Sequence, residues 1–394
     1  MDTLPPEIIR NIVSHLIVAA RKVPHINELC PITSLAPYAS ISQQWRDIVE
    51  SITFRHLILN SRRLTEADCK NYLTPLRLSY VRYIWYDFEF PAHNLAVTTD
   101  PEDYDDQLVF NRSVRQLLEV LSRFPHRDEP VVGLEMFITP PKKFALRLLR
   151  HETKRSRERT EVLFGNVIPA YVELFEDWDK GIAEIPAVSY FRVEPGSQSI
   201  LFSPSSMNRI ASKMPRLSRV EWWLTDEENI DSITDITETS QRTSLDDFYL
   251  LARVDSTILL PQQPRADALW PSIRRYNLEL KEHLPSGECI AQLPSKGYVY
   301  DQKIMDRFAI AAATCAARMP KIEELNVIHH GRTQMGICFN TCSEDEPCLE
   351  FFGQPDVPEP SEETLAIWKK AVKTHGLKWD VNITSEMGKV YHFY

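Results

Sequence analysis

The chain has 394 residues, and its 45 lysines and arginines against 55 aspartates and glutamates give a formal net charge of −10 at pH 7. Hydrophobic residues make up 43% and charged residues 25%, which excludes a wholly disordered or fibrous chain. Only 11 glycines occur, and G-x-G, P-loop and G-x-S-x-G sequences are absent. The common glycine-rich sites for dinucleotides, nucleoside triphosphates and acyl transfer are therefore excluded, and the acidic balance argues against general nucleic-acid binding.

The apolar stretches of the sequence predict neither export nor membrane insertion. The N-terminus lacks a basic segment followed by an apolar core. The most apolar stretches, residues 8–20 and 308–317, are too short or too polar to span a bilayer. Seven scattered cysteines indicate reduced thiols and not a disulfide framework. We therefore expect a cytoplasmic or nuclear protein that makes no membrane contact.

The first sixty residues predict two short amphipathic helices and a strand. An apolar stripe at helical spacing runs through residues 4–17, and Pro5 and Pro6 suit the first turn of a helix there. A second helix is expected from Ser40 to Glu50, and a strand over residues 55–59. Such short helices cannot bury their apolar faces against each other alone, so they need the rest of the chain or a partner.

These residues also follow an ordered motif, which reads Leu4-Pro5-x-Glu7-Ile8-x-x-x-Ile12, Ile41-Ser42-x-x-Trp45-x-x-Ile48 and Phe54-Arg55-His56-Leu57-x-Leu59. Over residues 3–55 the chain resembles an F-box, although its connector, residues 25–37, is longer than the usual turn. The resemblance implies docking on the Skp-type linker subunit of a cullin–RING ubiquitin ligase, and through it on cullin. It places the docking face at Leu4, Pro5, Ile8, Ile12, Ile41 and Trp45. The alternative is that these side chains pack only on the chain's own downstream domain.

The rest of the chain contains a weak internal repeat. Residues 211–223 align with residues 316–328, and in each copy a helix ends just before a proline and a strand begins a few residues later. Looser copies lie at residues 114–138 and 271–280. Units of this kind bury their apolar faces by stacking on their neighbours. A closing helix is expected from Ser361 to His375, with Gly376 as its stop, and a strand over residues 379–383.

We therefore predict an α/β (α+β) protein with two parts. Residues 1–55 form an all-helical F-box module, and residues 56–394 form an irregular solenoid of helix–turn–strand units. This second part resembles the degenerate leucine-rich-repeat-like C-terminal regions of fungal F-box proteins. An independent α+β domain is the alternative.

Three charged segments interrupt the expected units. Residues 142–159 are basic and read either as a nuclear signal or docking patch, or as the solvated face of a helix that runs into a loop. Residues 100–106 and 225–247 are acidic or rich in serine and threonine and are expected to be exposed insertions.

The strongest catalytic constellation is His329-His330 followed by Cys338, Cys342 and Cys348. The C-x₃-C spacing suits zinc, but the second pair of ligands is irregular, and neighbouring histidines on a strand point to opposite faces. A cysteine nucleophile would need an oriented histidine that nothing in the sequence locates. We therefore predict no metal, no cofactor and no catalytic residue, and keep a metal or thiol enzyme around these cysteines as a further alternative.

Aromatic residues crowd two of the expected strands. Tyrosine, tryptophan and phenylalanine recur through residues 80–90, and Trp222 and Trp223 are adjacent. Because consecutive strand residues face opposite ways, some of these rings point away from the core unless helices cover both faces. Trp85, Trp222 and Trp223 are therefore the candidates for binding a target protein.

The F-box resemblance implies a non-enzymatic substrate receptor of an SCF-type ubiquitin ligase, and the expected solenoid supplies a surface for its target. This receptor would link an unidentified target to the Skp-type subunit and act by raising the target's effective concentration. A scaffold whose F-box-like helices pack only internally is the alternative.

Overall fold

The computed structural model describes residues 4–16, 20–22, 29–31, 35–89, 102–139, 170–194, 200–224, 236, 239–240, 242, 244–260, 270–281, 284–292, 299–330, 334–342, 347–353, 359–385 and 388–393. Its helices are α1 Pro6–Leu16, α2 Gln43–Thr53, α3 Ser61–Cys69, α4 Pro75–Tyr80, α5 Glu102–Leu121, α8 Pro204–Ser212, α10 Gln302–Ala316 and α11 Glu362–Thr374, with short 3-10 helices η1 Ala36–Ser40 and η2 Ser256–Leu259.

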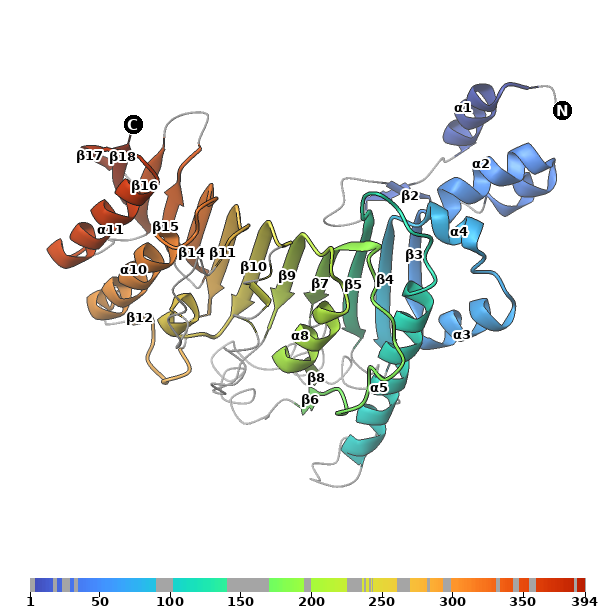
Figure 1. The fold of residues 1–394 in the computed structure, drawn as a ribbon, viewed down its shortest axis with the longest axis horizontal. Coiled ribbons are helices and arrows are strands. Elements are labelled where there is room, and N and C mark those ends of the chain that lie inside the picture. The colour runs from blue at the N-terminus through green and yellow to red at the C-terminus, as the bar shows by residue number, and fades with distance from the viewer. Residues whose placement is uncertain are drawn as a thin grey trace, which may run out of the picture.

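A twelve-stranded sheet runs through most of the molecule (Figure 1). Its strands are β3 His56–Asn60, β4 Tyr83–Glu89, β5 Val132–Thr139, β7 Val188–Glu194, β9 Arg219–Trp223, β10 Asp247–Ala252, β11 Arg275–Leu280, β14 Glu324–His330, β15 Gln334–Asn340, β16 Cys348–Gly353, β17 Trp379–Ser385 and β18 Gly388–Phe393. Three further pairs are β1 Ala20–Lys22 with β2 Leu29–Pro31, β6 Ala170–Val172 with β8 Ile200–Phe202, and β12 Ala291–Gln292 with β13 Val299–Tyr300.

The strands from β3 to β14 are parallel, and they lie in the sheet in the order in which they occur in the chain. From β14 onward the pairing is antiparallel, through β15, β16, β18 and β17. Figure 1 shows the strands following one another along a curved sheet, with the N-terminal helices next to β3 and the C-terminal strands at the other end. Mixed α/β structure, as predicted, is confirmed.

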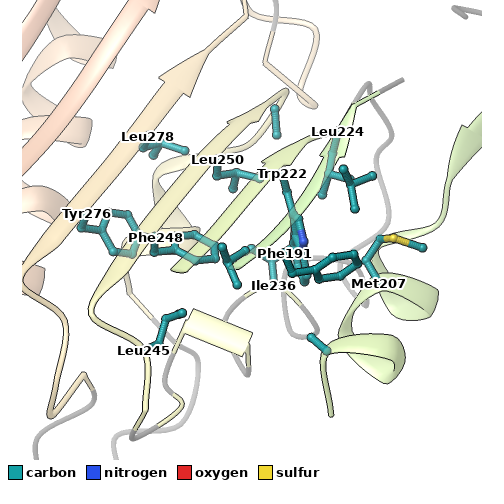
Figure 2. Close-up of a cluster of buried hydrophobic side chains, with 14 of the residues drawn as sticks. Phe191, Met207, Trp222, Leu224, Ile236, Leu245, Phe248, Leu250, Tyr276 and Leu278 are labelled. Atoms are coloured by element: carbon teal, nitrogen blue, oxygen red, sulfur yellow. The ribbon is translucent and has the colours of Figure 1, made fainter. Parts of the chain in front are cut away.

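Helices pack on one face of this sheet only, within the described part of the chain. Alternate strand residues share one hydrophobic core with the buried side chains of α3, α4, α5, α8, α10 and α11. An aromatic series crosses the middle of that core, with ring centroids 6.3 Å apart for Phe191 and Trp222, 6.4 Å for Trp222 and Phe248, and 5.2 Å for Phe248 and Tyr276 (Figure 2). Each strand contributes one ring, so burial and ring contacts join neighbouring units.

The repeat read from the sequence corresponds to real elements. The helix-and-breaker segments end α8 and α10, and each is followed by its strand, β9 and β14. The looser copies contain β11, and α5 followed by β5. At the C-terminus, Ser361 caps α11 by accepting from the Thr364 amide, and Gly376 has a φ of +75°. The expected helix and its glycine stop are both confirmed.

The helix expected from about Ser40 to Glu50 is present as α2, and it begins at Gln43 because Ser42 caps it and the preceding residues form η1. One expectation about local structure was wrong. The described part of 225–247 is not an exposed insertion, since Ile236 and Leu245 are buried in the core and Ser240 accepts a hydrogen bond from Trp270 Nε1 at 2.8 Å. Residues 102–106 begin α5. The basic segment 142–159 lies outside the described residues.

Candidate functional site

The N-terminal helices build a hydrophobic core of their own. Helices α1 and α2 and the 3-10 helix η1 contribute its residues, none of which belongs to the main core. Ser42 accepts from the Trp45 amide at the start of α2. The buried members of this small core are Ile9, Val13, Leu35, Trp45, Ile48 and Val49.

The predicted docking residues divide into exposed and buried sets. Ile8, Ile12 and Ile41 are 45%, 37% and 37% exposed, and Pro5 is exposed beside them in the chain. Ile8 and Ile12 lie one turn apart on α1, so their side chains are neighbours. Leu4 is partly buried against the small core.

Trp45 does not belong on that surface. It is 5% exposed, and its ring stacks on Tyr38 with centroids 6.5 Å apart. The sequence pattern shows that Trp45 is on the apolar side of α2, but that side faces α1 and η1. Trp45 therefore holds the helices together and supports the exposed isoleucines from within.

A charged contact joins this helical module to the sheet. The Arg77 guanidinium on α4 donates to both oxygens of Glu50 on α2, at 3.0 and 2.6 Å, and stacks over the Phe54 ring at 5.1 Å. Hydrogen bonding from Arg77 lowers the pKa of Glu50.

The second candidate surface is the face of the sheet that no described helix covers, which we call the open face. Strand registers arrange its side chains in three rows from β3 to β16. Row 1, nearest the starts of the parallel strands, is His56, Tyr83, Gly133, Tyr190, Arg219, Asp247, Arg275, Glu324, Asn340 and Cys348. Row 2 is Ile58, Trp85, Glu135, Arg192, Glu221, Tyr249, Asn277, Asn326, Cys338 and Glu350. Row 3 is Asn60, Asp87, Phe137, Glu194, Trp223, Leu251, Glu279, Ile328, Gly336 and Phe352.

Arg192 lies at the centre of the open face and is fully buried. Its guanidinium nitrogens approach three glutamates, with Nη2 2.8 Å from Glu194, Nη1 3.3 Å from Glu221 and Nε 3.6 Å from Glu135. The guanidinium also lies 5.2 Å from the Trp223 ring centroid. Burial opposes its charge, but Glu221 and Glu135 outweigh that effect and raise the pKa of Arg192. The arrangement is a cage of carboxylates and one indole around a cation.

Two tyrosines complete this cage. Tyr83 donates to Glu135, and Tyr190 donates to Glu221 at 2.5 Å. Burial, reinforced by these glutamates, raises the pKa of both hydroxyls. The tyrosines therefore stay protonated and act as fixed donors that hold the glutamates in place.

The three candidate tryptophans have different positions. Trp222 is fully buried on the helix-covered face, so it is a core residue and the expectation that it binds a target is wrong. Trp85 and Trp223 are half-buried on the open face, and the ring centroids of Trp85 and Phe137 are 5.7 Å apart. Because adjacent strand residues face opposite sides of a sheet, Trp222 could have been identified as a core residue and Trp223 as a surface residue if the helix-covered face had been known.

A groove of about 580 Å³ crosses the starts of the parallel strands at one edge of the open face. Two of its arginines pair within the groove, since Arg275 binds both oxygens of Asp247 at 2.7 and 2.6 Å and Arg274 binds Glu323. Arg219 instead lies 3.6 Å from Glu221 of row 2. Its lining residues are Arg82, Tyr83, Val131, Gly133, Ser189, Tyr190, Ser218, Arg219, Asp246, Asp247, Arg274, Arg275 and Glu323.

The histidine and cysteine constellation is not assembled into one cluster. His329 is buried, while Cys338 and Cys348 lie on the open face and Cys342 is exposed beyond β15. Burial, with help from Glu350, raises the pKa of Cys338 to about 12, so this thiol is not a ready nucleophile. Within the described residues no three histidine, cysteine, aspartate or glutamate side chains could hold a metal ion together.

Comparison with known proteins leaves the chain without an assigned family. No protein-family model matches it, and no curated protein matches its sequence. Among the helices of the described ranges, none combines the length and hydrophobicity that a membrane crossing requires.

Proposed function

We propose that this chain is a substrate receptor of an SCF-type ubiquitin ligase. In this proposal residues 3–55 act as an F-box that docks on a Skp-type linker subunit. The strands from β3 onward act as an irregular leucine-rich-repeat-like solenoid that presents a target protein. The chain makes and breaks no bond itself, and works by holding the target near the ubiquitin-loaded enzyme.

One observation carries the proposal. The N-terminal module completes its own core and still leaves Ile8, Ile12 and Ile41 exposed. A module that served only to cover the sheet would turn such residues toward the main core. Ile8 and Ile12 lie one turn apart on α1, and neighbouring exposed isoleucines on a small helical module are typical of a protein-binding surface. The ordered F-box motif specifies which partner this surface fits.

The sheet supports the second half of the proposal. Sequential parallel strands with helices on one face leave a broad face free of described helices, and Trp85 and Trp223 lie on it. Half-buried tryptophans are common anchors of protein interfaces.

The docking assignment is tested by replacing two isoleucines with glutamate. We expect Ile8→Glu/Ile12→Glu to weaken copurification with a Skp-type subunit by about 100-fold or more, because two apolar anchors would carry desolvated charges. Asn11→Glu is the control, since it adds a charge at an exposed position of the same helix. Circular dichroism and thermal unfolding confirm that each variant is folded. Undiminished binding of the double variant would refute the docking face.

A further inference from the structure

We propose that the open face binds its partner through a positively charged, lysine- or arginine-rich segment of a protein. The inference rests on the proposed function only in calling that partner the target.

Rows 2 and 3 of the open face are strongly acidic. Only Arg192 carries a positive charge there. The carboxylates of these rows are Asp87, Glu135, Glu194, Glu221, Glu279 and Glu350. An excess of carboxylates concentrated on one face repels acidic partners and favours basic ones.

The groove at the strand starts does not contribute to this excess. There Arg275 pairs with Asp247 and Arg274 with Glu323, while Arg219 reaches Glu221 of row 2 at 3.6 Å. The negative charge is therefore concentrated beyond row 1, on the part of the face that carries Trp85 and Trp223.

The Arg192 cage shows which ligand chemistry this face accommodates. There the face already holds one guanidinium between glutamates and the Trp223 ring. Arg192 and Arg219, whose Nη2 lies 3.6 Å from Glu221, balance two of the three glutamates, so the cage keeps an excess of one negative charge. Glu194 remains 28% exposed at its edge, and Glu279 is half-buried two strands beyond Trp223. An incoming lysine or arginine would meet carboxylates and aromatic rings of the same kind.

An unfilled acceptor points the same way. Asn326 lies in row 2 and is 7% exposed. Its Nδ2 donates to Asn277 at 2.7 Å, whereas its Oδ1 is buried without a hydrogen-bond partner. A buried acceptor is costly to leave unsatisfied, and ammonium and guanidinium groups are donors only. A basic side chain that reached this position would satisfy it.

The test compares two fluorescein-labelled probes, octa-arginine and octa-glutamate, against the full chain by fluorescence anisotropy at about 50 mM NaCl, where screening is weak. We expect octa-arginine to bind and octa-glutamate not to bind. Glu194→Gln/Glu279→Gln should weaken octa-arginine binding about fivefold or more. Glu194 accepts from Arg192, and Glu279 accepts from the Tyr249 hydroxyl. Glutamine keeps an acceptor oxygen at both positions, so we expect the fold to be preserved.

A matched variant separates this face from the general acidity of the chain. Glu66→Gln/Glu119→Gln removes the same charge from α3 and α5, where both glutamates are exposed. We expect it to leave octa-arginine affinity within about twofold of wild type. Equal weakening by the two double variants, or preference for octa-glutamate, would overturn the proposal.

Binding to the Skp-type subunit, measured on the same preparations, keeps the two proposals distinguishable. Octa-arginine binding that depends on Glu194 and Glu279, without Skp-type binding, would sustain the basic-partner surface and refute the ligase function. Binding to the Skp-type subunit with no preference for octa-arginine would support the ligase function and refute the basic-partner surface.

Discussion

Arg192 balances glutamates that three neighbouring strands bring to one place. Glu135 is on β5, Glu194 follows Arg192 on β7, and Glu221 is on β9. Glu135 and Glu221 are almost fully buried, so water cannot solvate their charges as it solvates those of surface carboxylates. Arg192 is therefore the buried cation that all three glutamates share, and Arg219 adds a contact of 3.6 Å with Glu221.

Arg192→Met should destabilise the chain by about 3–5 kcal/mol at pH 7, because the glutamates keep their burial and lose their cation. Urea unfolding at pH 7 measures this. Arg192→Lys, which keeps the charge, should lose less, and an equal loss in the two variants would contradict the role of the cation.

Gly133 is needed because Tyr83 and Tyr190 close over it. A Cβ at this position would lie 2.7 Å from Tyr83 Cδ2 and 3.2 Å from Tyr190 Cδ1. Tyr83 is 4% exposed and tied to Glu135, so its ring cannot easily move.

We therefore expect Gly133→Ala to cost about 1–3 kcal/mol of unfolding free energy. The same change in a Tyr83→Ala background should cost clearly less, because the clash has been removed. Chemical denaturation of the four proteins in this cycle gives the coupling. Equal costs in the two backgrounds would exclude the tyrosine ring as the cause.

At the scale of elements, α11 is fixed on α10 through its last turn. His375 Nε2 lies 3.0 Å from the carbonyl oxygen of Ala316, the last residue of α10, and its ring lies 5.8 Å from Phe339. Burial lowers the pKa of His375, although the contact with Ala316 partly opposes this.

A histidine with a lowered folded pKa binds its proton more weakly than in the unfolded chain. Its contribution to stability is therefore present above the unfolded pKa of about 6.5 and is lost as the pH falls below it. We expect wild type to lose stability between pH 7.5 and 5.5, and His375→Phe to lose less over the same interval. Urea unfolding at the two pH values checks this, and an identical loss in both proteins would rule out His375 as its source.

Secondary structure was predictable where local chemistry decides it. The cap at Ser361, the stop at Gly376 and the breakers after α8 and α10 act within a few residues, so the sequence contains the whole signal. It was not predictable whether the apolar side of a helix or strand faces the core or a binding surface. Trp45 and Trp222 both satisfy the right periodicity, but which face is covered depends on partners that lie far away in the chain.

At the scale of the whole molecule, the sequence predicts stacked helix-then-strand units but not the strand register that brings distant residues together. The Arg192 cage joins residues 135, 192 and 221, and no local pattern relates these positions. It depends on the register of β5, β7 and β9, which emerges only when the units stack. The division into two hydrophobic cores also required the structure, since the stripes on α1 and α2 fit internal packing equally well.

That division predicts how the chain responds to truncation. The two cores share no residue, and the Arg77 contact with Glu50 and Phe54 is their main polar link among the described residues. Such a partly exposed ion pair contributes about 1 kcal/mol or less. A chain that starts at Arg55 keeps β3 and should therefore unfold cooperatively, with a Tm within a few degrees of the full chain. Calorimetry measures this. Collapse of the remaining chain would instead favour the alternative in which the N-terminal helices are a structural part of a scaffold.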